Sequence, residues 1–97
     1  MKYRLDVAPS VIKEARKIYQ VREREKKGSG DRFTDALVEC YARVKTNPHG
    51  FQIRKDPFRH VMLHLLKYRL VYKVEGQLVS IVQVRHTSRR VSKKFGP

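Results

Sequence analysis

The sequence predicts an α+β fold in which an N-terminal helix hairpin packs on one face of a small antiparallel sheet. Two segments repeat apolar residues at three- and four-residue spacing, which is typical of amphipathic helices. Four shorter segments alternate apolar and polar residues, as strands with one buried face do. Because 97 residues suffice for one core, we expect a single domain over residues 1–97, in the order strand, helix, helix, strand, strand, strand.

The chain begins with a predicted strand and helix. Residues 2–7 alternate strictly and place Tyr3, Leu5 and Val7 on one side, which favours a short strand. Ser10 is the expected N-cap of the helix, because its hydroxyl can accept a hydrogen bond from an unpaired amide of the first turn. Helical spacing continues from there to about residue 26.

A tight turn at residues 28–30 leads into the second predicted helix, for which Asp31 is the expected cap. The apolar positions of this helix are Phe33, Ala36, Leu37, Cys40, Tyr41 and Val44. Residues 47–50 should end the helix, because proline disfavours helix in the preceding residue and glycine permits left-handed turns. The two helices are therefore expected to form an antiparallel hairpin over a common core.

The second half of the chain predicts three strands after an irregular connection at residues 51–57. The strands are expected at about residues 58–66, 68–74 and 78–86. Glu75 and Gly76 predict a hairpin turn between the last two, because glycine can take a positive φ. Val82 and Val84 are expected on the buried face. Residues 87–97 are expected to form a basic tail.

The charge of the chain points to acidic partners. Lysine and arginine number 23 against 9 acidic residues, which gives a formal net charge of +14. Such an excess favours binding to a polyanion such as DNA, RNA, an anionic membrane or an acidic protein. No apolar run approaches the roughly 18 residues of a membrane span, and the single Cys40 cannot form an internal disulfide. We therefore expect a cytoplasmic protein that does not act on membranes.

The three late strands are expected to gather cations on their outward face. The residues on this parity are His60, His64, Arg69, Lys73, Gln83 and Arg85. A solvated face explains any one of them, but a set without a carboxylate, continued by a basic tail, predicts an anion-binding surface. His60 and His64 would lie about 13 Å apart on a strand, which is too far for one metal ion. No metal site and no cofactor are therefore expected.

Several segments together resemble a known family. The first is the N-terminal strand with its PS-type helix start. The second is the second half of the helix hairpin, DRFTDALVECYARVKTNPHG, and the third is the C-terminal half, FRHVMLHLLKYRLVYKVEGQLVSIVQVRHTSRR. In order and spacing they resemble the RelE/ParE superfamily of toxins from bacterial type II toxin–antitoxin systems, over nearly the whole chain. The resemblance implies one of two targets: RelE-like members cut mRNA in the ribosomal A site, and ParE-like members poison DNA gyrase.

A RelE-like interpretation implies metal-free RNase chemistry, in which cations stabilise the developing charge and basic side chains move protons. The candidate catalytic residues are then Arg69, which matches the arginine of the family's YRLVY-like strand, with His60, His86 and Arg89. The family has two lysines on the preceding strand, and their positions correspond to about His60 and Met62 in this sequence. Methionine supplies neither a charge nor a proton. The family's C-terminal tyrosine has no match, since no tyrosine follows Tyr72; His86 with Arg89 or Arg90 could substitute.

These departures favour a ParE-like, plasmid-stabilisation type of toxin that poisons DNA gyrase and is not an enzyme. The candidate target- or nucleic-acid-binding residues are His64, Lys73, Arg85, Arg90, Lys93 and Lys94. The alternatives are a ribosome-dependent mRNA endoribonuclease and a non-toxic basic nucleic-acid-binding protein. Either toxin interpretation implies a cognate acidic antitoxin, which would offset the charge of +14.

Overall fold

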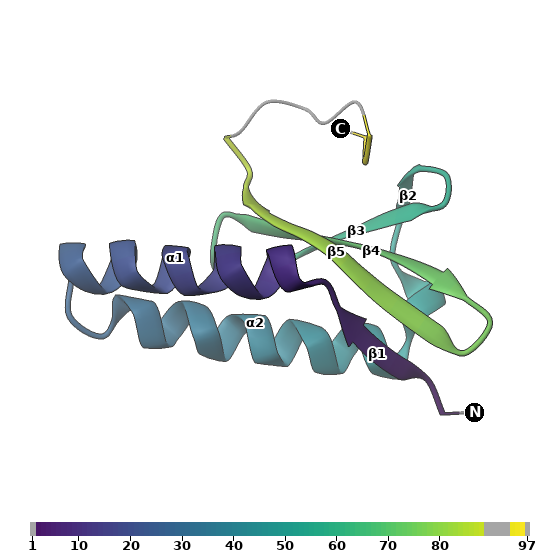
Figure 1. The fold of residues 1–97 in the computed structure, drawn as a ribbon, viewed down its shortest axis with the longest axis horizontal. Helices are drawn as coiled ribbons and strands as arrows, with labels where there is room; N and C mark the ends of the chain where they lie inside the picture. Colours follow the sequence, from purple (N-terminus) through teal and green to yellow (C-terminus); the bar gives the residue numbers. More distant parts are fainter. Residues whose placement is uncertain (1, 89–93, 97) are drawn as a thin grey trace.

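In the computed structural model, which describes residues 2–88 and 94–96, two helices pack on one face of a five-stranded sheet (Figure 1). The elements are β1 Arg4–Val7, α1 Pro9–Glu25, α2 Ser29–Thr46, the 3₁₀ helix η1 Pro48–Gly50, β2 Ile53–Lys55, β3 Phe58–Met62, β4 Tyr68–Glu75 and β5 Leu78–His86. The α+β class and the helix hairpin are confirmed. Neither described helix is both long and apolar enough to cross a membrane.

The sheet is mixed, so the prediction of a wholly antiparallel sheet was wrong for its first strand. The strand order is β1-β5-β4-β3-β2. β1 runs parallel to β5, with Arg4 opposite Leu78 and Val7 opposite Ile81, whereas the other neighbouring strands are antiparallel. Alternation of apolar residues identifies a strand with one buried face, but it carries no information about the direction of the partner.

Helix α1 begins one residue before the predicted cap. Ala8 is the N-cap residue, with φ −59° and ψ 141°, and no side chain caps the helix. Pro9 occupies the first helical position, where its missing N–H would have had no helical partner. Ser10 therefore lies inside the helix, and the prediction that it caps the helix was wrong.

Helix α2 is capped by a side chain of α1. Gly28 precedes the helix with φ 88°, and the Glu23 carboxylate accepts hydrogen bonds from the amides of Gly28 at 2.9 Å and Gly30 at 3.0 Å. A carboxylate at this position also interacts favourably with the helix dipole. Asp31 lies in the first turn of the helix rather than at its cap, which corrects the predicted boundary and ties the two helices together at the hairpin.

The strands around β3 differ from the predicted bounds. β3 ends at Met62, and Leu65 lies in the following loop with φ 60° and 85% exposure. His64 is therefore not on a strand. Residues 53–55, predicted to be irregular, form β2 and pair with β3. All three are exposed, so this short strand has no buried face that alternation could reveal.

A β-bulge changes the orientation of side chains along β5. Val71 lies opposite Gln83, but the next residue, Tyr72, lies opposite Ile81. The extra residue, Val82, is only half-buried, which contradicts its predicted place in the core. Beyond the bulge the orientation switches, so that both Ile81 and Val84 are buried although they have different parity.

Tyr72 anchors the core between the helices and the sheet. The core residues are Val11, Phe33, Ala36, Leu37, Cys40, Val44, Val61, Leu63, Leu70, Tyr72, Val79, Ile81 and Val84. The Tyr72 hydroxyl donates a hydrogen bond to the carbonyl oxygen of Pro48 at 2.6 Å, and burial raises its pKa to about 12. This bond fixes β4 to the connection that follows α2.

Replacing Tyr72 with phenylalanine tests this anchor. The variant keeps the ring but leaves the buried Pro48 carbonyl without its donor, so we expect a loss of about 1–3 kcal/mol in the free energy of unfolding. Equilibrium urea unfolding of wild type and Tyr72→Phe measures the difference. An unchanged unfolding midpoint would show that the hydrogen bond contributes nothing to the fold.

Candidate anion-binding site on the open face of the sheet

Four basic side chains gather on the sheet face opposite the helices, and we call them the cationic cluster. They are Arg54 of β2, His60 of β3, Arg69 of β4 and Arg85 of β5. The strand register brings them together, because Arg69 lies opposite Met62 on one side and directly opposite Arg85 on the other. His60, Arg69 and Arg85 belong to the parity that points away from the core, and the charge of Arg54 lies close enough to affect the pKa of His60 and of Arg69.

His60 has a defined protonation state within the cluster. It is 7% exposed, and its Nε2 lies 2.7 Å from the carbonyl oxygen of Phe95. A carbonyl only accepts, so Nε2 carries the proton. The guanidinium Nη1 of Arg69 lies 3.4 Å from Nδ1 and can only donate, so Nδ1 is the acceptor. These two neighbours together select the neutral imidazole with its proton on Nε2.

The charges of the cluster disfavour further protonation. Burial is the main cause of a lowered pKa at His60; the hydrogen bond to Phe95 opposes it, and the charges of Arg69, Arg85 and Arg54 lower it further. Burial likewise lowers the pKa of Arg69, and Arg54 and Arg85 add to the effect. Like charges held this close together favour an electron-rich partner.

Residues 94–96, which we call the C-terminal segment, supply such a partner. The segment lies on the side of the sheet opposite the helices (Figure 1). Besides the Phe95 carbonyl on His60, the Gly96 carbonyl accepts from Nη2 of Arg85 at 3.4 Å. The Phe95 ring packs edge-to-face on Phe58 with centroids 4.9 Å apart. Arg85, at 4% exposure, is thus buried in contact with the segment.

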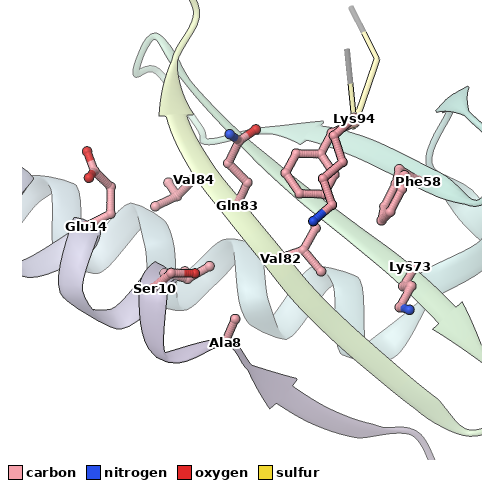
Figure 2. A pocket seen from close by; sticks show the side chains of 11 residues that line it. Ala8, Ser10, Glu14, Phe58, Lys73, Val82, Gln83, Val84 and Lys94 are labelled. Atoms are coloured by element: carbon pink, nitrogen blue, oxygen red, sulfur yellow. The ribbon is translucent and has the colours of Figure 1, made fainter. Parts of the chain in front are cut away.

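A groove of about 540 Å³ lies beside the C-terminal segment. Figure 2 shows β5 passing between Ser10 and Glu14 of α1 on one side and Lys94 on the other. Lys73 and Gln83 also line the groove. The Gln83 Oε1 atom is buried and accepts no hydrogen bond from the part of the chain that the structure describes. The groove therefore places further polar groups next to the C-terminal segment.

The remaining predicted residues of this face lie outside the cluster. The Lys73 amino group is 3.2 Å from a carboxylate oxygen of Glu75, so the expectation of a carboxylate-free face was wrong. His64 lines a separate hollow against α2, in the loop after β3. The Lys94 amino group lies 5.4 Å from the centroid of the Phe95 ring. Arg89, Arg90 and Lys93 lie outside the described residues.

His86 lies on the other face of the sheet. It follows Arg85 on β5, and consecutive residues of a strand point to opposite sides. Its ring packs edge-to-face on Tyr68 at 5.2 Å and lines a hollow with Glu14 of α1. Its Nδ1 accepts a hydrogen bond from the amide of Ser88 at 3.1 Å. The structure therefore does not bring His86 to Arg69 and His60.

Arg54 is the residue of the cluster that the sequence did not reveal. It belongs to β2, which lacks a buried face, and a cation in an expected loop has no special signal. Among the described residues, no group of three or more histidine, cysteine, aspartate or glutamate side chains is placed to hold a metal ion.

One family model covers most of the chain. The model of one family, described as the ParE toxin of the type II toxin–antitoxin system parDE, matches residues 5–91. No curated protein matches the sequence.

Solved structures with a similar fold come from bacteria and archaea. The chromosomal ParDE system from P. aeruginosa aligns with a TM-score of 0.79 and 12% identity, over 90% of this chain and 98% of that chain. The isolated E. coli RelE toxin aligns with a TM-score of 0.63 and 26% identity, over 91% and 87%. The RelE–RelB complex from Pyrococcus horikoshii aligns with a TM-score of 0.57 and 16% identity, over 93% and 100%.

The neutral state of His60 makes a prediction about pH. Its pKa in the folded protein lies below the ordinary value of 6.5, so the unfolded chain binds more protons between the two values. The stability that neutral His60 contributes is present above pH 6.5 and is lost as the pH falls through the folded pKa.

Urea unfolding of wild type and His60→Gln at neutral and mildly acidic pH measures this contribution. We expect the free energy of unfolding of wild type to fall more steeply on acidification, because glutamine does not titrate. Parallel pH profiles for the two proteins would contradict the assigned protonation state.

Proposed function

Since the chain belongs to the ParE family of toxins from type II toxin–antitoxin systems, we propose that it arrests bacterial growth by poisoning DNA gyrase. One observation carries the choice of target. Among the described residues, His60 is the one histidine at the cationic cluster, because His86 lies on the opposite face. RNA cleavage by proton transfer uses both a base and an acid, whereas binding to phosphate groups needs positioned cations and no proton transfer.

In this proposal the cationic cluster contacts the target without reacting. Arg54, Arg69 and Arg85 present guanidinium groups on one face of the sheet, and such groups bind phosphate oxygens in pairs. DNA held by gyrase offers phosphates of this kind. The rigid strands beneath the cluster hold its geometry in place.

We further propose that an acidic antitoxin holds the chain before release. The net charge of +14 supports this partner, because complementary charge speeds association and disfavours wrong partners. The similar P. horikoshii structure is itself a RelE–RelB complex.

A second candidate function is ribosome-dependent cleavage of mRNA. The contact between Arg69 and neutral His60, 3.4 Å apart, favours it. A cation beside an unprotonated imidazole nitrogen could stabilise a phosphate and accept a proton from the attacking 2′-hydroxyl.

Induction of the protein in bacteria separates these functions. We expect growth to stop, the SOS response to begin, and cleaved DNA to accumulate on gyrase. Rapid loss of translation with codon-biased mRNA ends would instead support the nuclease. Unaffected growth would reject both toxin functions and would favour a non-toxic nucleic-acid-binding protein.

Replacement of Arg69 by glutamine tests the cluster with purified gyrase. A charged hydrogen bond contributes about 1.5–3 kcal/mol, so we expect Arg69→Gln to need roughly 10- to 100-fold more protein for the same amount of trapped cleaved DNA. The matched control is Arg24→Gln, which removes the same charge from an exposed position of α1. If Arg69→Gln and Arg24→Gln are equally potent, the cluster does not take part in target recognition.

A further inference from the structure

The C-terminal segment fills the cationic cluster with oxygen atoms. The carbonyl of Phe95 accepts from His60 at 2.7 Å and the carbonyl of Gly96 accepts from Arg85 at 3.4 Å. Peptide carbonyls carry only partial negative charge. An ionised phosphate oxygen forms shorter and roughly twice as strong hydrogen bonds with the same donors, so it is a better partner for these side chains than the segment is.

We propose that the cationic cluster is a binding site for a phosphodiester group of nucleic acid, and that residues 94–96 occupy this site until such a group displaces them. The proposal rests on the proposed function and names the chemical group that the cluster recognises. The segment is then an internal competitor, which lowers the apparent affinity for nucleic acid without changing the site itself.

The segment is attached less deeply than the core. Lys94 is exposed, Phe95 is half-buried, and Gly96, which has no side chain to anchor it, is buried. In contrast, Phe33 and Tyr72 of the core are fully buried. Segments that bury little apolar surface open at a low free energy compared with the core. The segment can therefore leave while the sheet beneath it stays folded.

Gly96 allows the backbone to approach the cluster. Its φ of 90° is unfavourable for other residues, and a Cβ atom there would lie 2.7 Å from the Cβ of Lys55. Any larger residue at this position would push the segment away from β2. The close approach thus depends on one residue that is separate from the charged donors.

Displacement of the segment would also expose an aromatic ring. Phe58 packs against Phe95, with ring centroids 4.9 Å apart, and lines the groove beside the cluster together with Lys73 and Gln83 (Figure 2). A free phenylalanine face beside cations is the arrangement on which unpaired bases stack. The expected ligand is therefore single-stranded, with a phosphodiester on the cluster and a neighbouring base on Phe58.

The test measures binding of a short fluorescent thymidylate oligonucleotide by anisotropy at fixed ionic strength. We expect Phe95→Ala and Gly96→Ala each to bind about tenfold more tightly than wild type, because each releases the segment without altering a charge. Arg85→Gln should bind more weakly than the matched control Arg24→Gln, which loses the same charge on an exposed helix. Circular dichroism checks that each variant is folded, and Arg69→Gln replaces Arg85→Gln if the latter unfolds.

Unchanged or weaker binding by both segment variants would overturn the proposal, as would equal binding by the cluster variant and its control. A uridylate oligonucleotide of the same length shows whether the site prefers the phosphodiester of RNA or of DNA. Tighter binding of the thymidylate or the uridylate oligonucleotide by the segment variants supports the site. Gyrase inhibition is assayed in parallel. If the oligonucleotide binds as expected but gyrase is not inhibited, only the gyrase target is rejected. If gyrase is inhibited but the oligonucleotide does not bind as expected, only this inference is rejected.

Discussion

The antiparallel pairing of β4 with β5, including its bulge, determines which side chains share a face of the sheet. On β4, Leu70 and Tyr72 enter the core while Arg69 points away from it. On β5, the bulge turns Ile81 into the same core and leaves Arg85 opposite Arg69. Like charges directly opposite one another destabilise a pair of strands. The same pairing that completes the core therefore creates an unfavourable contact on the other face.

That unfavourable contact is maintained by the rest of the molecule. The buried hydroxyl of Tyr72 fixes β4 to the connection after α2, and the Glu23 carboxylate fixes the two helices at their turn. A sheet supported in this way can hold guanidinium groups together although they repel each other. Local conflicts of this kind are concentrated at functional sites in natural proteins. The cluster is thus a place where like charges repel each other and where an anion would relieve the repulsion.

The sequence predicted the features that depend on periodicity. Both helices and the shared face of His60 and Arg69 follow from spacing alone. The opposite orientation of Arg85 and His86 follows from strand alternation as well, and it separates His86 from Arg69, with which it was predicted to act. The bulge and the parallel β1 were missed because both depend on long-range pairing. For the C-terminal segment the sequence predicted only a basic tail. The contacts of the segment with the cluster are made by backbone carbonyl groups, which every residue has, so no pattern of side chains reveals them.

The parallel pairing of β1 with β5 also affects how the protein is made. The strand at the beginning of the chain finds its partner only in residues 78–81, so this contact spans most of the sequence and forms late in folding. Arg85 lies on the same partner strand. Synthesis must therefore pass residue 81 before β1 can pair fully, and residue 85 before the cationic cluster can include Arg85. A product that terminates before residue 78 lacks both the partner of β1 and the complete cluster.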